Sequence, residues 1–574
     1  MKKLTALLLA AFMLVAVFVI AACGEETPTT AATTAATTAA GTDATTAATE
    51  ADATEATNAV NPDDPSTEAT TAATTAGGED STTEATTAGA TEATTAATTE
   101  ATTEATASDP NEGYEKPEGY ANVDFGGYTF RFVSTLDTAD ADESHPNRWC
   151  TKREIEVDSR NGGTVIDTAV YDRNFVMSQL YNCSISVVQE GNGSTLIKND
   201  VNSGTSEVDF ATVQGVLFGT NKEGTYINLY NLDLDFTLPG WNKTLIDQTT
   251  VRDANGVDHL YDFDADFNLC GYRATWVLFC NLDLYESNKA KWGDTEGMSI
   301  FDHVNNGTWT VDKMMEMIAG VAQDGDGDQA FTTDSEKDIY GFMTSNYNYE
   351  AFITSIGMKF VTVDENHQFT TSPDLIQAND AANALKKVVE LYQLDGVNVG
   401  SYTLAKERLM EGRNLFCGEV LDVLERMSDA EDLNVTVVPE PLYQPSENPV
   451  YKFYVNTKGS YYVISKNACR GDRDMVANFL NVFVYHSNKI VFPAFVETYG
   501  SIYCQDARAA QMLEYIINGR QYDLAFYKNF NGTAGMVKSQ LDSKSIKLSR
   551  TAATIVAELQ NQINTLVNDM GMSE

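Results

Sequence analysis

The chain has 574 residues, which is more than the roughly 250 to 300 that one hydrophobic core usually holds, so we expect several domains or non-globular sequence beside one domain. Lysine and arginine number 38 against 82 acidic residues, and the net charge of −44 excludes the basic face that nucleic-acid binding requires. All tryptophan and tyrosine residues, and all phenylalanines except Phe12 and Phe18, lie in residues 114–574. Only that part of the chain can build a core.

The N-terminus has the features of a secretion signal. Two lysines precede an apolar run over residues 4–22, and Cys23 follows directly. A basic start, an apolar stretch and small residues before the cut are typical of a signal peptide. The Ile-Ala-Ala before Cys23 resembles the lipobox of bacterial lipoproteins, in which the cysteine is acylated and becomes the first residue of the mature chain. We expect a lipoprotein signal peptide over residues 1–22 and lipidation at Cys23; an uncleaved membrane helix is the alternative, because the run is just long enough to span.

A segment rich in threonine and alanine follows. Residues 27–110 contain no aromatic residue and no Leu, Ile or Met, and acidic residues are scattered through them. Burial in such a segment cannot repay the entropy of ordering, so we predict a disordered tether over residues 23–113. At about 5 to 6 Å times the square root of its length, this tether reaches roughly 50 Å from the membrane.

From Tyr114 onward the pattern alternates strands with helices. Apolar periodicity predicts strands over residues 128–134, 183–189 and 208–214, and helices over residues 168–182, 308–322, 380–394, 472–487 and 552–570. Thr310 is the candidate N-cap of the second of these helices. An α/β body with helices on the faces of sheets follows from this order. The chain has no second apolar run of about 18 residues, so a channel or permease is excluded.

Beyond Cys23 the chain has an odd number of cysteines without close pairs, which argues against a disulfide framework or a zinc site. We expect them to be buried thiols. They are Cys150, Cys183, Cys270, Cys280, Cys417, Cys469 and Cys504.

Several segments in their order and spacing resemble the extracellular solute-binding lipoproteins of ABC importers, of the family 1-like group related to maltodextrin-binding and other sugar-binding proteins. The resemblance spans nearly all of residues 120–530, and no single motif carries it. The segments are residues 125–134, 167–188, 256–287, 307–320, 409–427, 434–443, 459–466 and 519–530.

The resemblance implies a two-lobed periplasmic-binding-protein-like fold of class II, with hinge strands between the lobes. Carried across, lobe 1 covers about residues 120–274 and 455–487, and lobe 2 about residues 275–447 and 488–574. The implied function is capture of an extracellular solute, a carbohydrate or oligosaccharide, in an interlobe cleft and delivery to an ABC permease. We expect a monomer at the extracellular face of the cell membrane, with no required cofactor.

A sugar presents flat apolar faces beside rings of hydroxyls, so its site needs aromatic platforms and polar side chains together. Residues of these types gather near the expected lobe junction. Residues of these types are, taken one at a time, more often core or surface residues than ligand contacts, and it is the set at one junction that favours a site. The candidates are Trp276, Arg273, Asp264, Asp266, Tyr347, Tyr349, Glu419, Tyr454 and Asn456.

The stretch DGDGDQAFTTDS over residues 324–335 spaces its acids like positions 1, 3 and 5 of a calcium loop, and resembles the EF-hand-like loop of many family members. Gln329 stands where the turn glycine belongs and Ser335 where a bidentate acid belongs, so we expect weak Ca²⁺ binding, with an acidic surface turn as the alternative. The candidate ligands are Asp324, Asp326, Asp328 and Asp334.

Three other kinds of protein are alternatives to a sugar-binding protein: an enzyme, a surface adhesin and a binding protein for another solute. The chain has no GxSxG, HExxH or phosphate-loop motif and no histidine pair with metal-ligand spacing. A glycosidase needs only two carboxylates, which the 82 acidic residues do not exclude, so the prediction that the protein is not an enzyme rests on the resemblance. A surface polysaccharide adhesin without transport fits the tether, and a peptide- or polyamine-binding protein fits the same fold. Sequence alone leaves both of these alternatives open.

Overall fold

The computed structural model describes the body of the chain. The described residues are 113–135, 152–190, 192–214, 221, 224–332, 335–345, 348–372, 379–427, 433–456, 459–504, 506–528, 530, 539 and 548–570. The predicted signal peptide, Cys23, the tether, Cys150, Asp334 and Tyr347 lie outside the described residues. Among the described residues, none of the helices is both long and apolar enough to cross a membrane.

A first sheet has five strands in the order β2-β1-β3-β15-β6. Strands β1, β2 and β3 are parallel, whereas β15 runs antiparallel to both of its neighbours. The strands are β1 (Tyr128–Thr135), β2 (Cys183–Glu190), β3 (Phe210–Gln214), β6 (Asp262–Phe263) and β15 (Ser460–Ile464). This order places a returning strand, β15, beside a strand that precedes it by more than two hundred residues.

Helices cover this sheet because their apolar residues recur at helical spacing. Phe479 of α14 stacks on Phe130 of β1 with ring centroids 3.6 Å apart, and Phe483 packs beside it. Helix α2 starts where Thr164 accepts a hydrogen bond from the Asp167 amide (3.1 Å), three residues earlier than the periodicity predicts. The helical elements of this region are η1 (Lys152–Glu154), α2 (Val165–Tyr181), α3 (Gly193–Ser203), η2 (Leu229–Asn231), α4 (Lys243–Thr249), η4 (Ala468–Gly471) and α14 (Arg473–His486).

A second sheet has five strands in the order β11-β8-β12-β7-β13. Strands β8, β11 and β12 are parallel, and β7 is antiparallel to β12 and β13. The strands are β7 (Trp276–Asn281), β8 (Tyr340–Ser345), β11 (Val397–Gly400), β12 (Asn414–Val420) and β13 (Val435–Val438). Every residue of β7, β8, β12 and β13 is buried, as expected for strands covered on both faces.

Helix α8 begins at the predicted cap, since the Lys313 amide donates to the Thr310 hydroxyl oxygen at 3.2 Å. The helical elements of this region are α6 (Leu282–Asn288), η3 (Lys289–Trp292), α7 (Ile300–Asn305), α8 (Val311–Val321), α9 (Tyr349–Ser355), α11 (Asn379–Leu391), α12 (Tyr402–Met410) and α13 (Val423–Met427). The predicted α/β class, with helices on the faces of two sheets, is confirmed. Below, the first-sheet region means residues 113–274 and 459–486, and the second-sheet region means residues 275–456.

The chain crosses between the two sheets twice at one place. It leaves the first sheet through α5 (Cys270–Arg273) into β7, and returns through β14 (Phe453–Tyr454) into β15. Thr275 and Val455 form an antiparallel bridge, and the Asn456 amide donates to the Ala274 carbonyl at 2.9 Å. The two crossing segments are therefore held side by side, as predicted for hinge strands.

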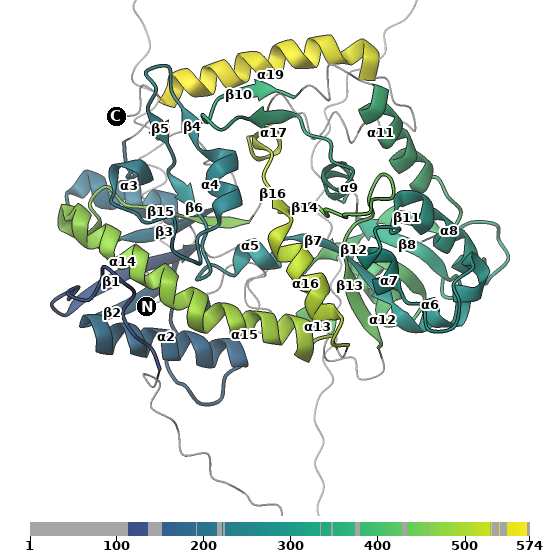
Figure 1. Cartoon of the computed structure of the whole chain (residues 1–574), viewed down its shortest axis with the longest axis horizontal. Helices are drawn as coiled ribbons and strands as arrows, with labels where there is room; N and C mark the ends of the chain where they lie inside the picture. Colours follow the sequence, from purple (N-terminus) through teal and green to yellow (C-terminus); the bar gives the residue numbers. More distant parts are fainter. Residues whose placement is uncertain are drawn as a thin grey trace, which may run out of the picture. The chain divides into compact units, whose positions relative to one another are not determined.

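The chain after residue 486 divides its contacts between both regions, although we expected it to pack mostly on the second lobe. Ile490 and Ala494 form a small core with Ala169 and Val176 of α2, and Figure 1 shows α14 continuing into α15 from beside α2 toward α16. Apolar residues of α15 face the first-sheet region because α15 extends α14, which covers the first sheet. The elements are η5 (Ser487–Val491) and η6 (Thr498–Ile502), both π-helical turns, with α15 (Phe492–Glu497), α16 (Ala509–Asn518), β16 (Arg520–Gln521), α17 (Leu524–Tyr527) and α19 (Leu548–Met570).

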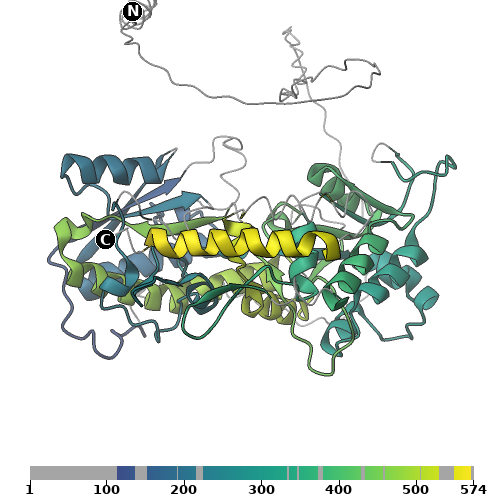
Figure 2. The same ribbon diagram turned by 90° about the horizontal axis from the view of Figure 1, so that it is seen from above.

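Two hairpins complete the fold. One consists of β4 (Val251–Arg252) and β5 (Asp258–His259) in the first-sheet region, and the other of β9 (Val361–Val363) and β10 (Phe369–Thr371) in the second-sheet region. Helix α19 contacts both β4 and β10, and Figures 1 and 2 show it extending across these hairpins.

Candidate ligand-binding site

Polar side chains gather at the carboxyl ends of the parallel strands in the second sheet. Strands β8 and β12 end at Ser345 and Val420, and Val420 pairs with Trp276 at the start of the antiparallel strand β7. In open α/β sheets, ligands bind beyond the carboxyl ends of the strands. This edge also adjoins the crossing segments, so a ligand bound there would contact the hinge.

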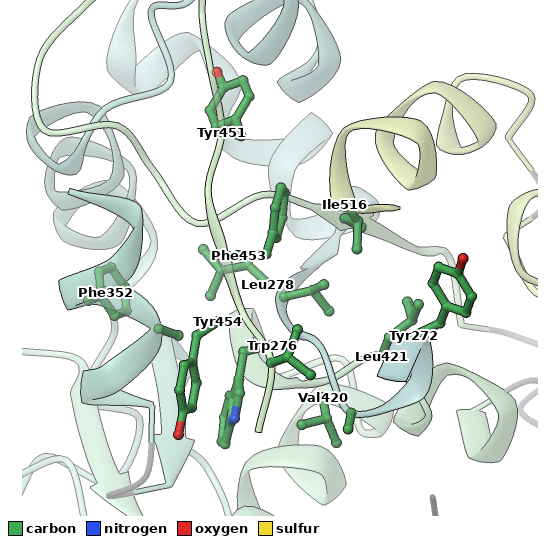
Figure 3. Close-up of a cluster of buried hydrophobic side chains, with 14 of the residues drawn as sticks. Tyr272, Trp276, Leu278, Phe352, Val420, Leu421, Tyr451, Phe453, Tyr454 and Ile516 are labelled. Carbon is green, nitrogen blue, oxygen red and sulfur yellow. The ribbon is translucent and has the colours of Figure 1, made fainter. Parts of the chain in front are cut away.

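Trp276 and Tyr454 lie next to each other at this edge (Figure 3). Each is only 2% exposed, so protein atoms cover the faces of the indole in this conformation. The indole Nε1 of Trp276 is buried without a hydrogen-bond partner among the described residues. A buried donor left unpaired costs about 1 to 3 kcal/mol, so this group would gain from a polar partner.

Helix α9 brings a carboxyl group to Tyr454 that the sequence analysis did not select. Burial raises the pKa of Glu350 above its usual range, while hydrogen bonds with Tyr454 and Tyr349 partly oppose that rise. The Tyr349 hydroxyl donates to Glu350 Oε1 at 3.1 Å. The predicted Tyr349 and Tyr454 are thus brought together, and Glu350 joins them.

Asn348 lies against the backbone of β12. It is fully buried, and neither its Oδ1 nor its Nδ2 has a hydrogen-bond partner among the described residues. A Cβ atom added at Gly418 would stand 1.8 Å from Asn348 Nδ2 and 2.8 Å from Thr344 Oγ1, so only glycine leaves room for both side chains. Asn348 was not predicted as a site residue, because an Asn directly before a helix is typical of an ordinary N-cap.

Glu419 is the predicted carboxylate nearest this cluster in the sheet. It follows Gly418 in β12 and is 5% exposed. The Val420 amide donates to Glu419 Oε1 at 3.0 Å, which directs the carboxylate toward the strand end. Trp276 pairs with Val420 and Glu419 pairs with Val277, so the side chains of Glu419 and Trp276 leave the sheet on opposite faces.

Arg273 is held by partners within the protein. Its guanidinium forms an ion pair with Glu154 of η1, and its Nε donates to the Tyr499 hydroxyl oxygen at 3.2 Å. Glu425 lies 4.0 Å from the same Nε. These contacts join η1, α5, α13 and the helix after α15, so in this conformation Arg273 stabilises the crossing.

Asp264 and Asp266 are likewise part of an internal network. Asn242 and Asn268 each donate to Asp264 at 2.8 Å, and Arg520 Nη1 lies 3.4 Å from it. Asp266 accepts hydrogen bonds from Tyr272 (2.5 Å) and Asn488 (2.7 Å).

Burial raises the pKa of both Asp264 and Asp266, with the charge of Arg520 opposing the rise. The guanidinium of Arg520 also lies 4.0 Å from the ring centroid of Tyr272. Both carboxylates thus anchor β16 and η5 to the first-sheet region. Asn456 acts through its backbone amide on Ala274, as described above.

The acidic loop brings three carboxylates together. Ligand atoms of Asp324, Asp326 and Asp338 all lie within 4.8 Å of one another. Asp338 is fully buried; its Oδ1 accepts from the Gly325 amide at 2.9 Å, and its Oδ2 has no hydrogen-bond partner among the described residues. The predicted Asp328 is not in this group, because its carboxylate accepts from the Ala330 amide at 2.8 Å. Asp338 was not predicted as a ligand because it lies beyond the twelve-residue loop pattern.

A hollow of about 280 Å³ lies elsewhere, between η1 and the start of α2. Two of its charged groups have partners within the protein: Arg153 pairs with Asp167, and Glu156 accepts from the Val187 amide at 2.9 Å. This hollow shares no residue with the edge of the second sheet.

No family model and no curated protein matches the chain. Solved structures do match it. An ABC transporter solute-binding protein from Thermotoga lettingae, bound with α-D-tagatose, has 12% identity over 77% of this chain and 100% of its own, with a TM-score of 0.43. The cyclic α-maltosyl-1,6-maltose binding protein from Arthrobacter globiformis has 13% identity over 77% of this chain and 100% of its own, with a TM-score of 0.43. The galacto-N-biose/lacto-N-biose I-binding protein of the ABC transporter from Bifidobacterium longum has 13% identity over 78% of this chain and 99% of its own, with a TM-score of 0.42. The solved structures to which this chain is similar therefore include sugar-binding proteins of ABC transporters.

Proposed function

We propose that this chain is an extracellular solute-binding protein that captures a carbohydrate or oligosaccharide and delivers it to an ABC permease. The observation that carries the proposal is the double crossing between two five-stranded sheets, bridged at Thr275 and Val455. Two paired crossing segments allow the two regions to rotate about a hinge and limit their other relative movements. Hinge closure around a solute couples occupancy to shape, which a permease can recognise.

The solute class follows from the residues at the edge of the second sheet. Trp276 and Tyr454 offer broad apolar faces, and Glu350 and Asn348 offer a carboxyl and an amide group. This combination suits a sugar, whose C–H faces and hydroxyl groups need both kinds of contact. Because Trp276, Tyr454 and Asn348 are buried, the solute would reach them when the two regions move apart.

The proposed location rests on the sequence of the N-terminus. The apolar run before Cys23 and the Thr/Ala-rich residues 27–110 fit a lipid anchor and a tether that keep the protein near its permease. We infer a monomer that acts by binding, without a catalytic step. Separately, we propose that Asp324, Asp326 and Asp338 hold Ca²⁺, because the cation would give the unpaired Oδ2 of Asp338 a partner.

A thermal-shift screen of the full chain tests the proposal. Sugars, dipeptides and polyamines are compared, and a ligand at 100 times its dissociation constant should add about 2.7 kcal/mol of stability. Glu350→Gln should lose most of the sugar-dependent shift, while the matched control Glu407→Gln, on the exposed face of α12, should keep it. Stabilisation by a peptide or an amine with none by any sugar would reject the proposed solute class.

A further inference from the structure

The two hairpins touch each other away from the crossing segments. The turn of the β9–β10 hairpin belongs to the second-sheet region, and the β4–β5 hairpin belongs to the first-sheet region. The Arg252 amide of β4 donates to the His367 carbonyl of that turn at 3.2 Å. This backbone hydrogen bond joins the regions at a point where the chain itself does not cross.

Charged side chains reinforce the contact. His367 Nδ1 lies 3.2 Å from Asp258 Oδ1, and Arg252 binds both oxygens of the same carboxylate at 2.7 and 2.8 Å. The Tyr230 ring faces His367 with centroids 6.3 Å apart, and Asp364 on the same turn is a further charge near the imidazole. The side chains of His367 and Asp258 are 20% and 17% exposed, so the pair is largely shielded from solvent.

The turn presents His367 in a fixed conformation. His367 has a φ of 57°, in the left-handed region that costs a residue with a side chain about 1 kcal/mol or more. Asp364 Oδ1 accepts from the amides of Asn366 and Gln368 at 2.9 Å each, which holds the turn in shape. A conformation of this cost persists only where the surroundings determine it.

Both ends of the β9–β10 hairpin are also held. At its start, the Phe360 amide donates to Asp523 Oδ2 at 2.7 Å. At its end, the Thr371 hydroxyl donates to Gln560 Oε1 of α19 at 3.3 Å. Helix α19 contacts β4 as well, and Figure 1 shows β4, β5 and β10 beneath it. The hairpin is therefore braced against elements that follow both sheets.

We propose that the contact between His367 and the Arg252–Asp258 pair is a latch that restrains rotation of the first-sheet region against the second-sheet region. The latch requires no ligand, so it goes beyond the proposed sugar capture and stands or falls independently of it.

Distance measurements between spin labels on the full chain test the latch without ligand. Labels on cysteines introduced at Asn199 of α3 and Glu407 of α12, both exposed, report on the two regions, with Cys23 and Cys150 replaced by serine. The six described cysteines are buried and should stay unlabelled.

The parent protein should give a narrow distance distribution. Asp258→Asn and His367→Gln should both broaden it and add a longer-distance population. Thr362→Val is the matched control, since the Thr362 hydroxyl bonds across its own hairpin to Thr370. Melting curves identify any variant that fails to fold, and in that case the other latch variant decides. Distributions that match the parent in both variants would overturn the latch.

Discussion

Replacing Trp276 with alanine probes the edge where the hinge meets the second sheet. The residue opens β7, pairs with Val420 of β12, and is 2% exposed beside Tyr454. Truncating a buried tryptophan removes its packing and leaves a cavity, which commonly costs about 3 to 5 kcal/mol. We therefore expect Trp276→Ala to lower the free energy of unfolding by that amount in urea titrations.

Trp276→Phe separates packing from the indole N–H. Since Nε1 has no hydrogen-bond partner among the described residues, its removal should cost no hydrogen bond, and the stability loss should fall to about 1 to 2 kcal/mol. If a sugar hydroxyl accepts from Nε1, calorimetric affinity should fall roughly tenfold, which corresponds to about 1.4 kcal/mol. An unfolding free energy of Trp276→Ala within about 1 kcal/mol of the parent would refute the buried placement. A loss of stability in both variants with unchanged sugar affinity would instead make Trp276 a core residue alone.

Three further predictions concern other buried groups. Ca²⁺ should raise the melting temperature of the parent but not of Asp338→Asn, and equal shifts in both would place the ion elsewhere. Burial raises the pKa of Glu440 from 4.5 to about 8, so its contribution to stability is fully present below about pH 4.5 and is lost as pH rises through about 8. In that window the free energy of unfolding of the parent should decline by up to about 1.4 kcal/mol per pH unit, and Glu440→Gln should remove this decline. Urea unfolding at several pH values measures both slopes. An unchanged slope in the variant would contradict the burial of a lone carboxyl. Gly418→Ala should cost about 1 to 3 kcal/mol, because the new methyl group collides with Asn348, and a stability equal to the parent's in thermal melts would show that the two do not touch.

Local patterns predicted much of the fold. Alternating apolar residues marked β1 and β2 to within one residue at their ends, and helical spacing marked α8, α11, α14 and α19 to within a few residues. Thr310 caps α8 as predicted, because a cap depends on neighbours within the same turn. The prediction that the cysteines are buried thiols is confirmed for the six that the structure describes.

The site was harder to predict because its contacts join distant segments. Arg273 was chosen as a sugar contact, yet its partner Glu154 lies 119 residues away in sequence. Asp264 and Arg520 are separated by 256 residues. No local sequence pattern predicts such pairs. The sequence around a charged residue near a hinge does not show whether a ligand or another side chain neutralises its charge. Asn348 and Glu350 became visible only once strand order placed α9 beside β12 and β14.

Small-angle scattering of the full chain, with and without a stabilising sugar, tests the central claim most directly. Capture by hinge closure predicts that the radius of gyration falls when the sugar is added and returns when it is removed by dialysis. The Thr/Ala-rich segment contributes equally to both samples, so the difference reports on the two sheet regions. A sugar that binds by calorimetry yet leaves the radius of gyration unchanged would contradict the claim that occupancy and closure are coupled.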